Sequence, residues 1–362
     1  MKKSKSLLIF IPSIENGGVE KNLYLVANYL AKRNVSVKIL TSFNNSRKFF
    51  DKKIKIISLK NKGNLINSRF LKTLITTFLF FKHCCFDNNL ILSFQSNITA
   101  ILLGLISNKK IIIRSNTSPD KYIKNSLKKF IFRFFFNFAD KIIVNSYEFK
   151  KRFKNFFSIS PIVIYNPFIK KNVKKVYFNF FNDKKFLRII NIGRLTDQKD
   201  HLTLLRAVKK LDKYRKFRLT IIGRGYREKL LRKYISENKL QEKVRMIGYR
   251  ENADSYIRDS DIFVLPSIYE GAPNVLLESI FLKKYVISAD CPTGPKEILN
   301  NGKYGDLFKI GDHNQLFKLL KNFNKNSPKV KYKVTQGYKS LARFDYRTNC
   351  EKYFQIISKY LR

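Results

Sequence analysis

Short apolar runs rich in β-branched residues alternate with segments of helical periodicity along most of the chain, and this alternation constrains the fold more than any other feature. In the first half the predicted strands are Ser6–Ile11, Val35–Thr41, Ile54–Leu59, Leu90–Phe94, Ile111–Arg114 and Lys141–Asn145. Strands that alternate with helices form parallel sheets whose faces the helices cover. The alternation therefore predicts an α/β fold with a doubly wound sheet.

A second series of strands begins after a stretch near residues 167–185 that has no clear periodicity. Its predicted strands are Leu187–Gly193, Arg218–Ile222, Val244–Ile247, Asp261–Pro266 and Tyr285–Ser288. A chain of 362 residues is also longer than most single domains. We therefore predict two doubly wound domains, at residues 1–170 and 171–343, followed by an amphipathic helical segment at 344–362.

The chain is strongly basic, with 73 Lys and Arg residues against 26 Asp and Glu residues and a formal net charge of +47. Such a charge attracts nucleic acids, acidic membrane surfaces and phosphate-bearing substrates, and by itself it does not choose among them. The abundance of Lys, Asn, Ile and Phe is equally typical of an AT-rich genome. Because the basic residues are scattered and no helix-turn-helix, RNA-recognition or zinc signature is present, we expect no nucleic-acid partner.

The cysteines and the lengths of the apolar segments indicate in which cellular compartment the protein resides. Cys84, Cys85, Cys291 and Cys350 show neither metal-ligand spacing nor a disulfide framework, which favours a reducing environment. Residues 7–11 are too few for the apolar core of a signal peptide. Residues 71–81 fall short of the roughly 20 apolar residues that a membrane-spanning helix needs. We expect a cytoplasmic protein that is soluble or peripherally bound to a membrane.

The segment 265–278 places two carboxylates where doubly wound folds bind ligands. A predicted strand ends at Pro266 and a helix is predicted to begin near Pro273, so Glu270 lies on the loop and Glu278 within the helix. Ligands of such folds bind at the carboxyl ends of the strands, where a helix N-terminus favours phosphate. A bound diphosphate is therefore expected to face Gly271, Ala272, Pro273 and Asn274.

The segment 191–200 repeats this arrangement with positive charges. A predicted strand leads into a loop that carries Arg194 and Lys199, and a helix follows. A guanidinium fork and a compact ammonium group together suit a leaving diphosphate, whose charge grows as a bond to it breaks. The alternative is that both are ordinary solvated charges.

Three motifs together resemble glycosyltransferase family 4, and they occur in both halves and in the expected order: Gly17-Gly18-Val19-Glu20, Gly193-Arg194-Leu195 with Lys199, and Glu270 with Glu278. That family has the GT-B fold, two Rossmann-like doubly wound domains that face a central cleft. It retains anomeric configuration and needs no bound metal. The resemblance implies a glycosyltransferase that takes a nucleotide-sugar as co-substrate and has no cofactor, with residues 344–362 crossing back to the N-terminal domain.

Carried over position by position, the resemblance implies that Arg194 and Lys199 hold the diphosphate, Glu278 the ribose hydroxyls and Glu270 the hydroxyls of the donor sugar. The catalytic candidates are therefore Glu270, Arg194 and Lys199. Gly17 and Gly18 would let the first N-terminal loop approach the donor phosphates or the acceptor closely.

The resemblance extends to the parts of the site that select the donor. Ile247 matches the position at which the family cradles the nucleobase, and residues 289–298 resemble members that build bacterial surface polysaccharides from UDP-sugars, with Thr293 and Gly294 facing the donor. We expect no NAD site because Glu228 replaces the third glycine of the dinucleotide fingerprint after Gly223 and Gly225.

The implied reaction moves a hexosyl or N-acetylhexosaminyl group from a UDP-sugar to a lipid-linked or glycan acceptor, as in lipopolysaccharide or capsule biosynthesis. The enzyme would act while peripherally attached to the inner face of the cytoplasmic membrane, so an anionic membrane surface is an expected partner. Two alternatives stay open: a GDP-mannose-dependent mannosyltransferase, and a non-catalytic basic protein that binds nucleic acid or membrane.

Two features depart from the family or compete with it. Many members carry a histidine near the acceptor, whereas residues 113–120 contain none, which leaves Arg114, Asn116 and Asp120 as acceptor-side candidates. Asp259 and Asp261 resemble the metal-binding Asp-x-Asp of a different transferase fold, but they come directly before a predicted strand. We expect no metal there.

Residues 122–138 form a predicted helix with a candidate membrane contact. The residues at helical spacing predict a core-facing stripe, made of Ile123, Leu127, Phe130, Ile131, Phe134, Phe135 and Phe138. Phe132 and Phe136 lie off the stripe near Lys128, Lys129 and Arg133, which is typical of a helix in an anionic membrane interface. We expect these two phenylalanines to contact the membrane; the alternative is that they pack against a neighbouring helix.

Overall fold

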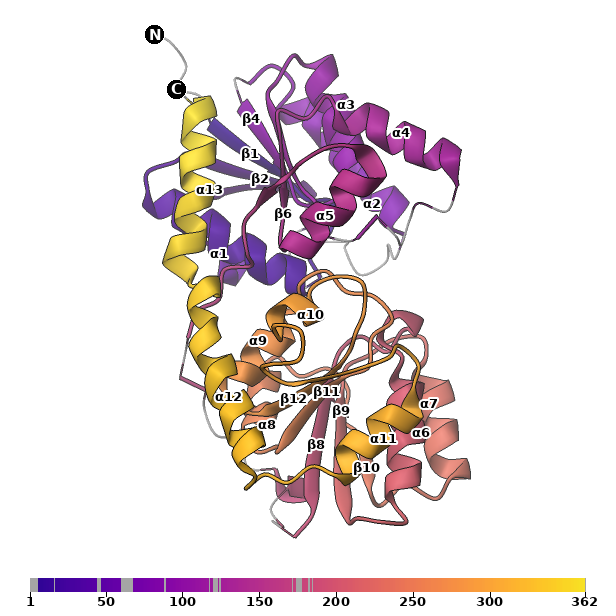
Figure 1. Ribbon diagram of the computed structural model, residues 1–362. Coiled ribbons are helices and arrows are strands. Elements are labelled where there is room, and N and C mark those ends of the chain that lie inside the picture. The colour runs from indigo at the N-terminus through magenta and orange to yellow at the C-terminus, as the bar shows by residue number, and fades with distance from the viewer. Residues whose placement is uncertain are drawn as a thin grey trace. The chain divides into compact units, whose positions relative to one another are not determined.

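The computed structural model divides the chain into two compact units (Figure 1). The N-terminal unit comprises residues 1–168 and 344–362, and the C-terminal unit comprises residues 169–343. The sequence-based boundaries lie after residues 170 and 343. The residues that the structure describes are 6–15, 17–43, 47–59, 68–87, 89–116, 118–119, 123, 125–170, 172–173, 178–181, 183 and 185–361.

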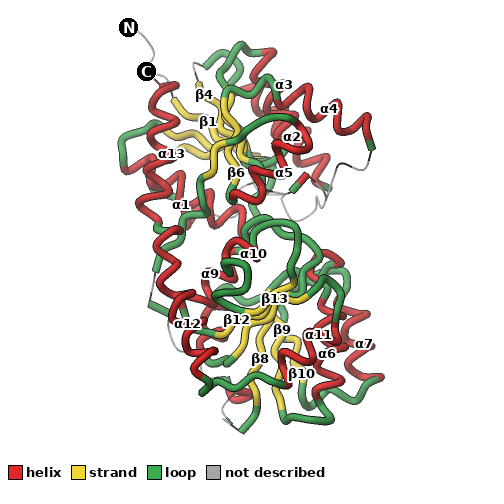
Figure 2. Tube along the Cα trace, in the orientation of Figure 1, coloured by secondary structure: helices red, strands yellow, loops and turns green. Residues whose placement is uncertain are grey.

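In the described part of the N-terminal unit, seven parallel strands form one sheet in the order β3-β2-β1-β4-β5-β6-β7. Figure 2 draws the strands in yellow. They are β1 (Ser6–Phe10), β2 (Val37–Phe43), β3 (Lys55–Leu59), β4 (Asn89–Ser93), β5 (Ile111–Arg114), β6 (Lys141–Val144) and β7 (Ile162–Val163). The chain moves outward from β1 in one direction and from β4 in the other. The neighbouring strands β1 and β4 therefore form the switch point of the sheet.

Helices cover both faces of this sheet. Because successive side chains of a strand point to opposite faces, Leu7 and Ile9 of β1 join one core cluster and Leu8 and Phe10 join another. The first face is covered by α1 (Gly18–Lys32) and α13 (Tyr346–Leu361). The second is covered by α2 (Arg69–His83), α3 (Asn97–Ile106), α4 (Ser126–Phe136) and α5 (Tyr147–Phe157).

The C-terminal helix α13 is held in the N-terminal unit by polar contacts as well as by its apolar side. The Arg114 Nε donates to the Tyr353 hydroxyl at 2.8 Å, and both side chains are buried. On the surface, Arg33, the C-cap residue of α1, forms an ion pair of 2.6 Å with Glu351. The chain therefore crosses from the C-terminal unit back to the N-terminal one through its last helix.

Helix α4 turns its apolar stripe outward, so the predicted orientation of this helix is wrong. Phe130 is 66% exposed and Phe134 is 50% exposed, whereas Phe136 is 2% exposed. Phe136 stacks on Phe153 of α5, with 5.2 Å between ring centroids. Phe132 is partly buried and packs against the same core cluster, because α5 supplies an aromatic surface that pattern alone does not reveal.

In the described part of the C-terminal unit, six parallel strands repeat the same order, β10-β9-β8-β11-β12-β13. They are β8 (Leu187–Ile192), β9 (Phe217–Ile222), β10 (Val244–Met246), β11 (Ile262–Leu265), β12 (Tyr285–Ala289) and β13 (Asp306–Phe308). Its helices are α6 (His201–Leu211), α7 (Glu228–Glu237), α8 (Ala253–Arg258), α9 (Asn274–Phe281), α10 (Pro295–Ile298), α11 (His313–Lys321) and α12 (Pro328–Ser340). Here the switch point lies between the neighbouring strands β8 and β11.

Candidate active site

Two loops meet at the switch point of the C-terminal sheet. Residues 193–200 follow β8, and residues 266–273 follow β11. The Ile268 N–H donates to the Gln198 carbonyl at 2.9 Å, and the Gln198 Nε2 donates to the Tyr269 carbonyl at 2.9 Å. These bonds join the two loops at the edge of the sheet where doubly wound folds bind ligands.

An ion pair between Lys199 and Glu270 joins the same two loops. The Lys199 Nζ lies 2.5 Å from the Glu270 Oε1, and the two side chains are 13% and 7% exposed. The lysine stem crosses Gly193, where an added Cβ would lie 3.3 Å from the Lys199 Cδ. Because an unpaired buried charge is costly, each member of this pair stabilises the other in its position.

The backbone around Glu270 is fixed by the loop after β12. The Thr293 Oγ1 donates to the Glu270 carbonyl at 2.6 Å. Gly294 adopts a φ of +84°, and an added Cβ there would lie 1.8 Å from the Gly271 carbonyl oxygen. Only glycine permits this backbone and this approach. We call Lys199, Glu270, Gly271, Thr293 and Gly294 the C-terminal cluster.

The remaining predicted residues of this unit lie around the C-terminal cluster. Arg194 is exposed on the loop after β8, and no carboxylate of the described residues lies within ion-pair distance of it. Helix α9 begins at Asn274, after Pro273 at its N-cap and the half-buried Ala272. Glu278 is half-buried one turn into this helix, on the same face as Asn274.

Two glycines that are not predicted site residues let the loop after β9 pack against the loop after β8. An added Cβ on Gly223 would lie 1.8 Å from the Gly193 carbonyl oxygen, and one on Gly225 would lie 2.2 Å from the Leu195 carbonyl oxygen. Beside them, the Ile247 N–H donates to the Ile221 carbonyl at 3.1 Å. The Gly-x-Gly after β9 is the sequence signal for this contact, and its role is close packing of backbone.

His201 follows the first loop and is almost completely buried, with 1% exposure. It begins α6 behind Asp200, whose carboxylate accepts from the Thr203 N–H at 3.3 Å. Neither ring nitrogen of His201 has a hydrogen-bond partner among the described residues. Burial, together with the nearby charge of Lys199, lowers its pKa to about 4. The imidazole is therefore neutral near pH 7 and adds no cation to the cluster.

Asp261 is occupied by a structural ion pair, which argues against the Asp-x-Asp alternative. The Arg188 Nε donates to one Asp261 oxygen at 2.9 Å, and the Arg188 Nη2 donates to the other at 2.6 Å. Burial opposes ionisation, but the bonds from Arg188 outweigh it and lower the pKa of Asp261. Within the described residues, no group of three or more His, Cys, Asp or Glu side chains could hold a metal ion.

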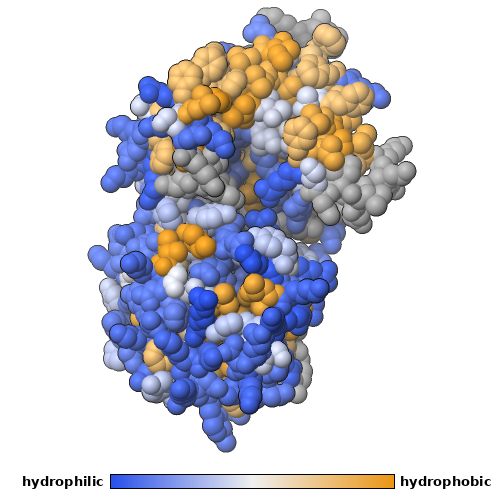
Figure 3. Space-filling model, turned by 90° about the vertical axis from the view of Figure 1, so that its right-hand side faces the viewer, coloured by the Kyte–Doolittle hydropathy of each residue, from blue (hydrophilic) through white to orange (hydrophobic). Residues whose placement is uncertain are grey.

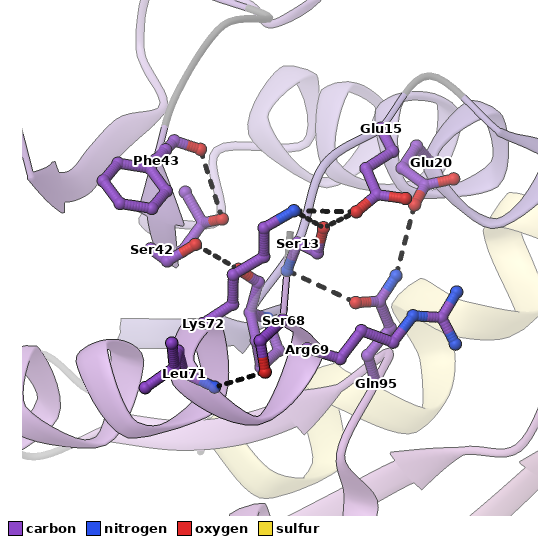
Figure 4. Close-up of polar contacts among 12 residues, drawn as sticks. Ser13, Glu15, Glu20, Ser42, Phe43, Ser68, Arg69, Leu71, Lys72 and Gln95 are labelled. Atoms are coloured by element: carbon purple, nitrogen blue, oxygen red, sulfur yellow. Dashed lines mark hydrogen bonds and ion pairs between the residues drawn. The ribbon is translucent and has the colours of Figure 1, made fainter. Parts of the chain in front are cut away.

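A polar cluster also lies at the switch point of the N-terminal sheet, on the loops after β1 and β4 (Figure 4). The Lys72 Nζ, from α2, lies 2.8 Å from the Glu15 Oε1, which also accepts from the Ser13 Oγ at 2.6 Å. Gln95 accepts from the Ser13 N–H at 3.3 Å and donates to the Glu20 Oε1 at 3.2 Å. We call Ser13, Glu15, Glu20, Lys72 and Gln95 the N-terminal cluster. Only Glu20 belongs to a motif visible in the sequence, and the other four members come from three separate segments.

The two predicted glycines of this unit lie at the start of α1, beside the N-terminal cluster. Gly17 is the N-cap residue and Gly18 the first helical residue. An added Cβ on Gly17 would lie 2.8 Å from the Glu20 Oε2, so the glycine leaves space for that carboxylate. Burial raises the pKa of Glu20.

Asn116 lies near the same edge, with its amide engaged inside the unit. Its Oδ1 accepts from Arg114, and its Nδ2 donates to the Phe94 carbonyl at 2.7 Å. Arg114 also donates to Asn166 at 2.7 Å and is almost fully buried, so it acts as a structural link to α13. Asp120 lies outside the described residues.

Comparison with known families matches both units. The family described as "Glycosyl transferases group 1" matches residues 174–340, and the one described as "Glycosyltransferase Family 4" matches residues 16–169. The two matches together leave only the ends of the chain and a short linking segment uncovered.

Curated relatives agree with the family matches. An N-acetylgalactosamine-N,N'-diacetylbacillosaminyl-diphospho-undecaprenol 4-alpha-N-acetylgalactosaminyltransferase of Campylobacter jejuni is 27% identical over 94% of each chain. An uncharacterised glycosyltransferase of Methanocaldococcus jannaschii is 35% identical over 56% of this chain and 55% of its own length. An amylovoran biosynthesis glycosyltransferase of Erwinia amylovora is 27% identical over 82% of this chain and 84% of its own length.

Solved structures share the fold of the whole chain. The Anabaena protein HepE, in complex with UDP and glucose, superposes with a TM-score of 0.79 at 16% identity, covering 98% of this chain and 100% of that one. Sucrose-phosphate synthase of Thermosynechococcus elongatus gives a TM-score of 0.81 at 14% identity, covering 98% of each chain. The chain therefore belongs to glycosyltransferase family 4 and is a glycosyltransferase with the GT-B fold.

Proposed function

We propose that the enzyme transfers a hexosyl or N-acetylhexosaminyl group from a UDP-sugar to a lipid-linked or glycan acceptor in bacterial surface polysaccharide biosynthesis, such as that of lipopolysaccharide or capsule. The observation that carries the proposal is the buried Lys199–Glu270 pair at the switch point of the unit that the group 1 family matches. The names of two Campylobacter jejuni relatives, which specify N-acetylgalactosamine transfer to undecaprenol-linked glycans, support this substrate class.

In this proposal the C-terminal unit holds the donor. Arg194, exposed and on the same loop as Lys199, binds the diphosphate together with that lysine, and Glu278 binds the ribose. Glu270 binds hydroxyls of the sugar, since its carboxylate is already fixed by Lys199 and its backbone by Thr293. The segment from Gly271 to Asn274 faces the diphosphate, and Ile247 faces the base.

The reaction breaks the bond between the sugar C1 and the diphosphate oxygen and forms a bond from C1 to an acceptor oxygen. The acceptor proton passes to the departing phosphate oxygen on the same face of the sugar, so the anomeric configuration is retained. Negative charge develops on the leaving diphosphate, and the positive charges of Arg194 and Lys199 stabilise it. We propose that no metal or other cofactor takes part.

The N-terminal unit holds the acceptor in this proposal. Gly17, Gly18 and the N-terminal cluster lie at the carboxyl edge of its sheet, the edge at which such sheets bind ligands. Asn116 supports that edge through its bond to Phe94. A lipid-linked acceptor resides in a membrane and nucleotide-sugars are cytoplasmic, so the proposal places the enzyme at the inner face of the cytoplasmic membrane.

The test is transfer from separate UDP-N-acetylhexosamines, UDP-hexoses and GDP-mannose to undecaprenyl-diphosphate-linked sugars, followed by mass spectrometry of the products and NMR of the new anomeric centre. We expect a UDP-sugar to be used with retention, and activity to survive EDTA. Use of GDP-mannose alone would contradict the assignment of a UDP-sugar as the donor and would favour a mannosyltransferase. Loss of activity in EDTA with recovery in Mn²⁺ would contradict the metal-free mechanism, and no transfer from any donor would favour a non-catalytic protein.

A further inference from the structure

Three neighbouring helices of the N-terminal unit expose large apolar side chains. Contacts join α2 to α3 and α3 to α4, so the three lie in one row on the same side of the sheet. The apolar face that we define here consists of Phe70, Leu71, Leu74, Phe78 and Phe81 of α2, Leu102, Leu105 and Ile106 of α3, and Leu127, Phe130, Ile131 and Phe134 of α4. Figure 3 shows hydrophobic side chains gathered on this unit, whereas those of the C-terminal unit are isolated.

The spacing of these residues shows that the apolar face is a property of whole helices. Phe70, Leu74, Phe78 and Phe81 recur along one side of α2, while Leu79 and Phe80 of the same helix are buried against the sheet. Each helix thus has one apolar side in the core and a second one in solvent. Single exposed apolar residues are normal on a protein surface, but a contiguous set of this size marks an interaction site.

The charges on these helices are all of one sign. Their sequences contain no Asp or Glu, and basic residues border the apolar face: Arg69 and Lys82 of α2, and Lys128, Lys129 and Arg133 of α4. All five are exposed. An apolar surface whose own helices carry only positive charges is complementary to the interface of an anionic lipid bilayer, where acyl chains and headgroups meet.

The same charges disfavour a second copy of this chain as the occupant. A symmetric dimer through this face would bring the like-charged borders of two copies together. Lipid headgroups would instead be attracted to them. None of the helices in the described residues is long and apolar enough to cross a bilayer. Contact in the plane of the interface is the arrangement that fits.

Helix α2 connects the apolar face to the N-terminal cluster. Phe70 and Leu74 lie on its exposed side, and Lys72 of the same turn reaches Glu15 at 2.8 Å and the Ser13 Oγ at 3.3 Å. A membrane bound to α2 would therefore contact the helix whose Lys72 bonds to the loop that we propose to hold the acceptor. The geometry points to the apolar face as the surface on which this enzyme docks to anionic lipid. This inference rests on the proposed function only for the reason why docking is useful, which is access to a lipid-linked acceptor.

Sedimentation with vesicles tests the docking directly, without any sugar substrate. The full-length protein is mixed with vesicles of phosphatidylcholine alone or of phosphatidylcholine with phosphatidylglycerol. We expect binding to the second kind, weakened about tenfold or more by Phe130→Ser with Phe134→Ser and by Lys128→Gln with Lys129→Gln. Matched controls in the C-terminal unit are Tyr214→Ser with Tyr332→Ser and Lys209→Gln with Lys210→Gln, which should bind like the unchanged protein.

Three further readouts separate the possible outcomes. The melting temperature of the Phe130/Phe134 variant should be unchanged because both side chains are exposed, and its transfer to a soluble acceptor should equal that of the unchanged protein. Equal vesicle binding by all variants would overturn the inference, as would a dimer in sedimentation velocity that these substitutions dissociate. Vesicle binding that is weakened by substitutions in the apolar face, in a protein that shows no transferase activity, would refute the proposed function but support the docking surface.

Discussion

Each unit places a lysine–glutamate pair at the switch point of its sheet, and the two pairs differ in how they are held. Lys199 and Glu270 lie 2.5 Å apart with the glutamate 7% exposed, and neighbouring loops are fixed around them by backbone contacts. Lys72 and Glu15 lie 2.8 Å apart with the glutamate 48% exposed, and the Ser13 hydroxyl bonds to both of them. The same fold thus carries one interlocked site and one open site.

This difference matches the two tasks in the proposed reaction. Stabilising a leaving diphosphate requires charges that are already in place when the bond breaks, because reorganisation at that moment costs rate. An acceptor only has to be positioned, and side chains on a solvated edge can adapt to its shape. Substitutions at the two sites should therefore differ in the size of their effects.

Lys199→Met should have the largest effect. It leaves the buried Glu270 carboxylate without its partner, so unfolding free energy should fall by about 3–5 kcal/mol. Turnover should fall by about 10²–10³-fold, since one cation that faces the leaving group is lost. Lys243→Met is the matched control, because Lys243 pairs with Asp212 at the same 2.5 Å but on the surface. Similar losses in both variants would show that the burial of the Lys199 pair is unimportant.

Gly294→Ala should come next, because two costs combine at this position. The new Cβ would meet the Gly271 carbonyl oxygen, and the φ of +84° also disfavours alanine. Gly311 has a similar φ of +75° with nothing within 4 Å of an added Cβ, so Gly311→Ala measures the backbone cost alone. Denaturant unfolding should give a loss of about 1 kcal/mol for Gly311→Ala and about 4 kcal/mol for Gly294→Ala. Equal losses would mean that the loops are not interlocked here.

His201 predicts a pH dependence of stability in the C-terminal unit. Its folded pKa of about 4 lies below the unfolded value of about 6.5, so between these values the unfolded chain binds more protons. Stability should therefore fall as the pH falls from 6.5 to 4, by about 3 kcal/mol. The measurement is the unfolding free energy of the unchanged protein minus that of His201→Leu at several pH values. A difference that stays constant across this range would show that His201 is not buried as a neutral ring.

Lys72→Met should have the smallest effect. Lys72 lowers the pKa of Glu15, so this pair contributes stability above the unfolded pKa of the glutamate and loses it as the pH falls through the folded value. Because Glu15 is half exposed, the loss near neutral pH should be at most about 1 kcal/mol, with UDP binding unchanged. A loss as large as that of Lys199→Met, measured by the same denaturant unfolding, would erase the distinction between the two sites.

The sequence predicted the fold class and most strands because most of these strands are buried apolar runs, each followed by a loop. It missed β7 and β13, which have two and three residues. The sequence also predicted that one edge of a sheet carries Arg194, Lys199, Glu270 and Glu278, because parallel strands end at a common edge.

The parts that the sequence did not predict depend on contacts between distant segments. The N-terminal cluster joins β1, β4 and α2, and no local pattern links Lys72 to Glu15. The orientation of α4 was predicted wrongly because both sides of this helix are apolar, and the choice between them depends on Phe153 of α5. Periodicity identifies an apolar side and does not say what covers it.

Titration of UDP into the protein by calorimetry tests the central claim most directly, that the loops after β8 and β11 bind the nucleotide-sugar. The comparison is between Arg194→Ala and Arg232→Ala, an exposed arginine of α7 that pairs with Glu228 in the same unit. We predict that Arg194→Ala weakens UDP binding by about tenfold or more, as expected for a lost charge-assisted contact, and that Arg232→Ala leaves it unchanged. Equal affinities of both variants and the unchanged protein would contradict the assignment of the donor site.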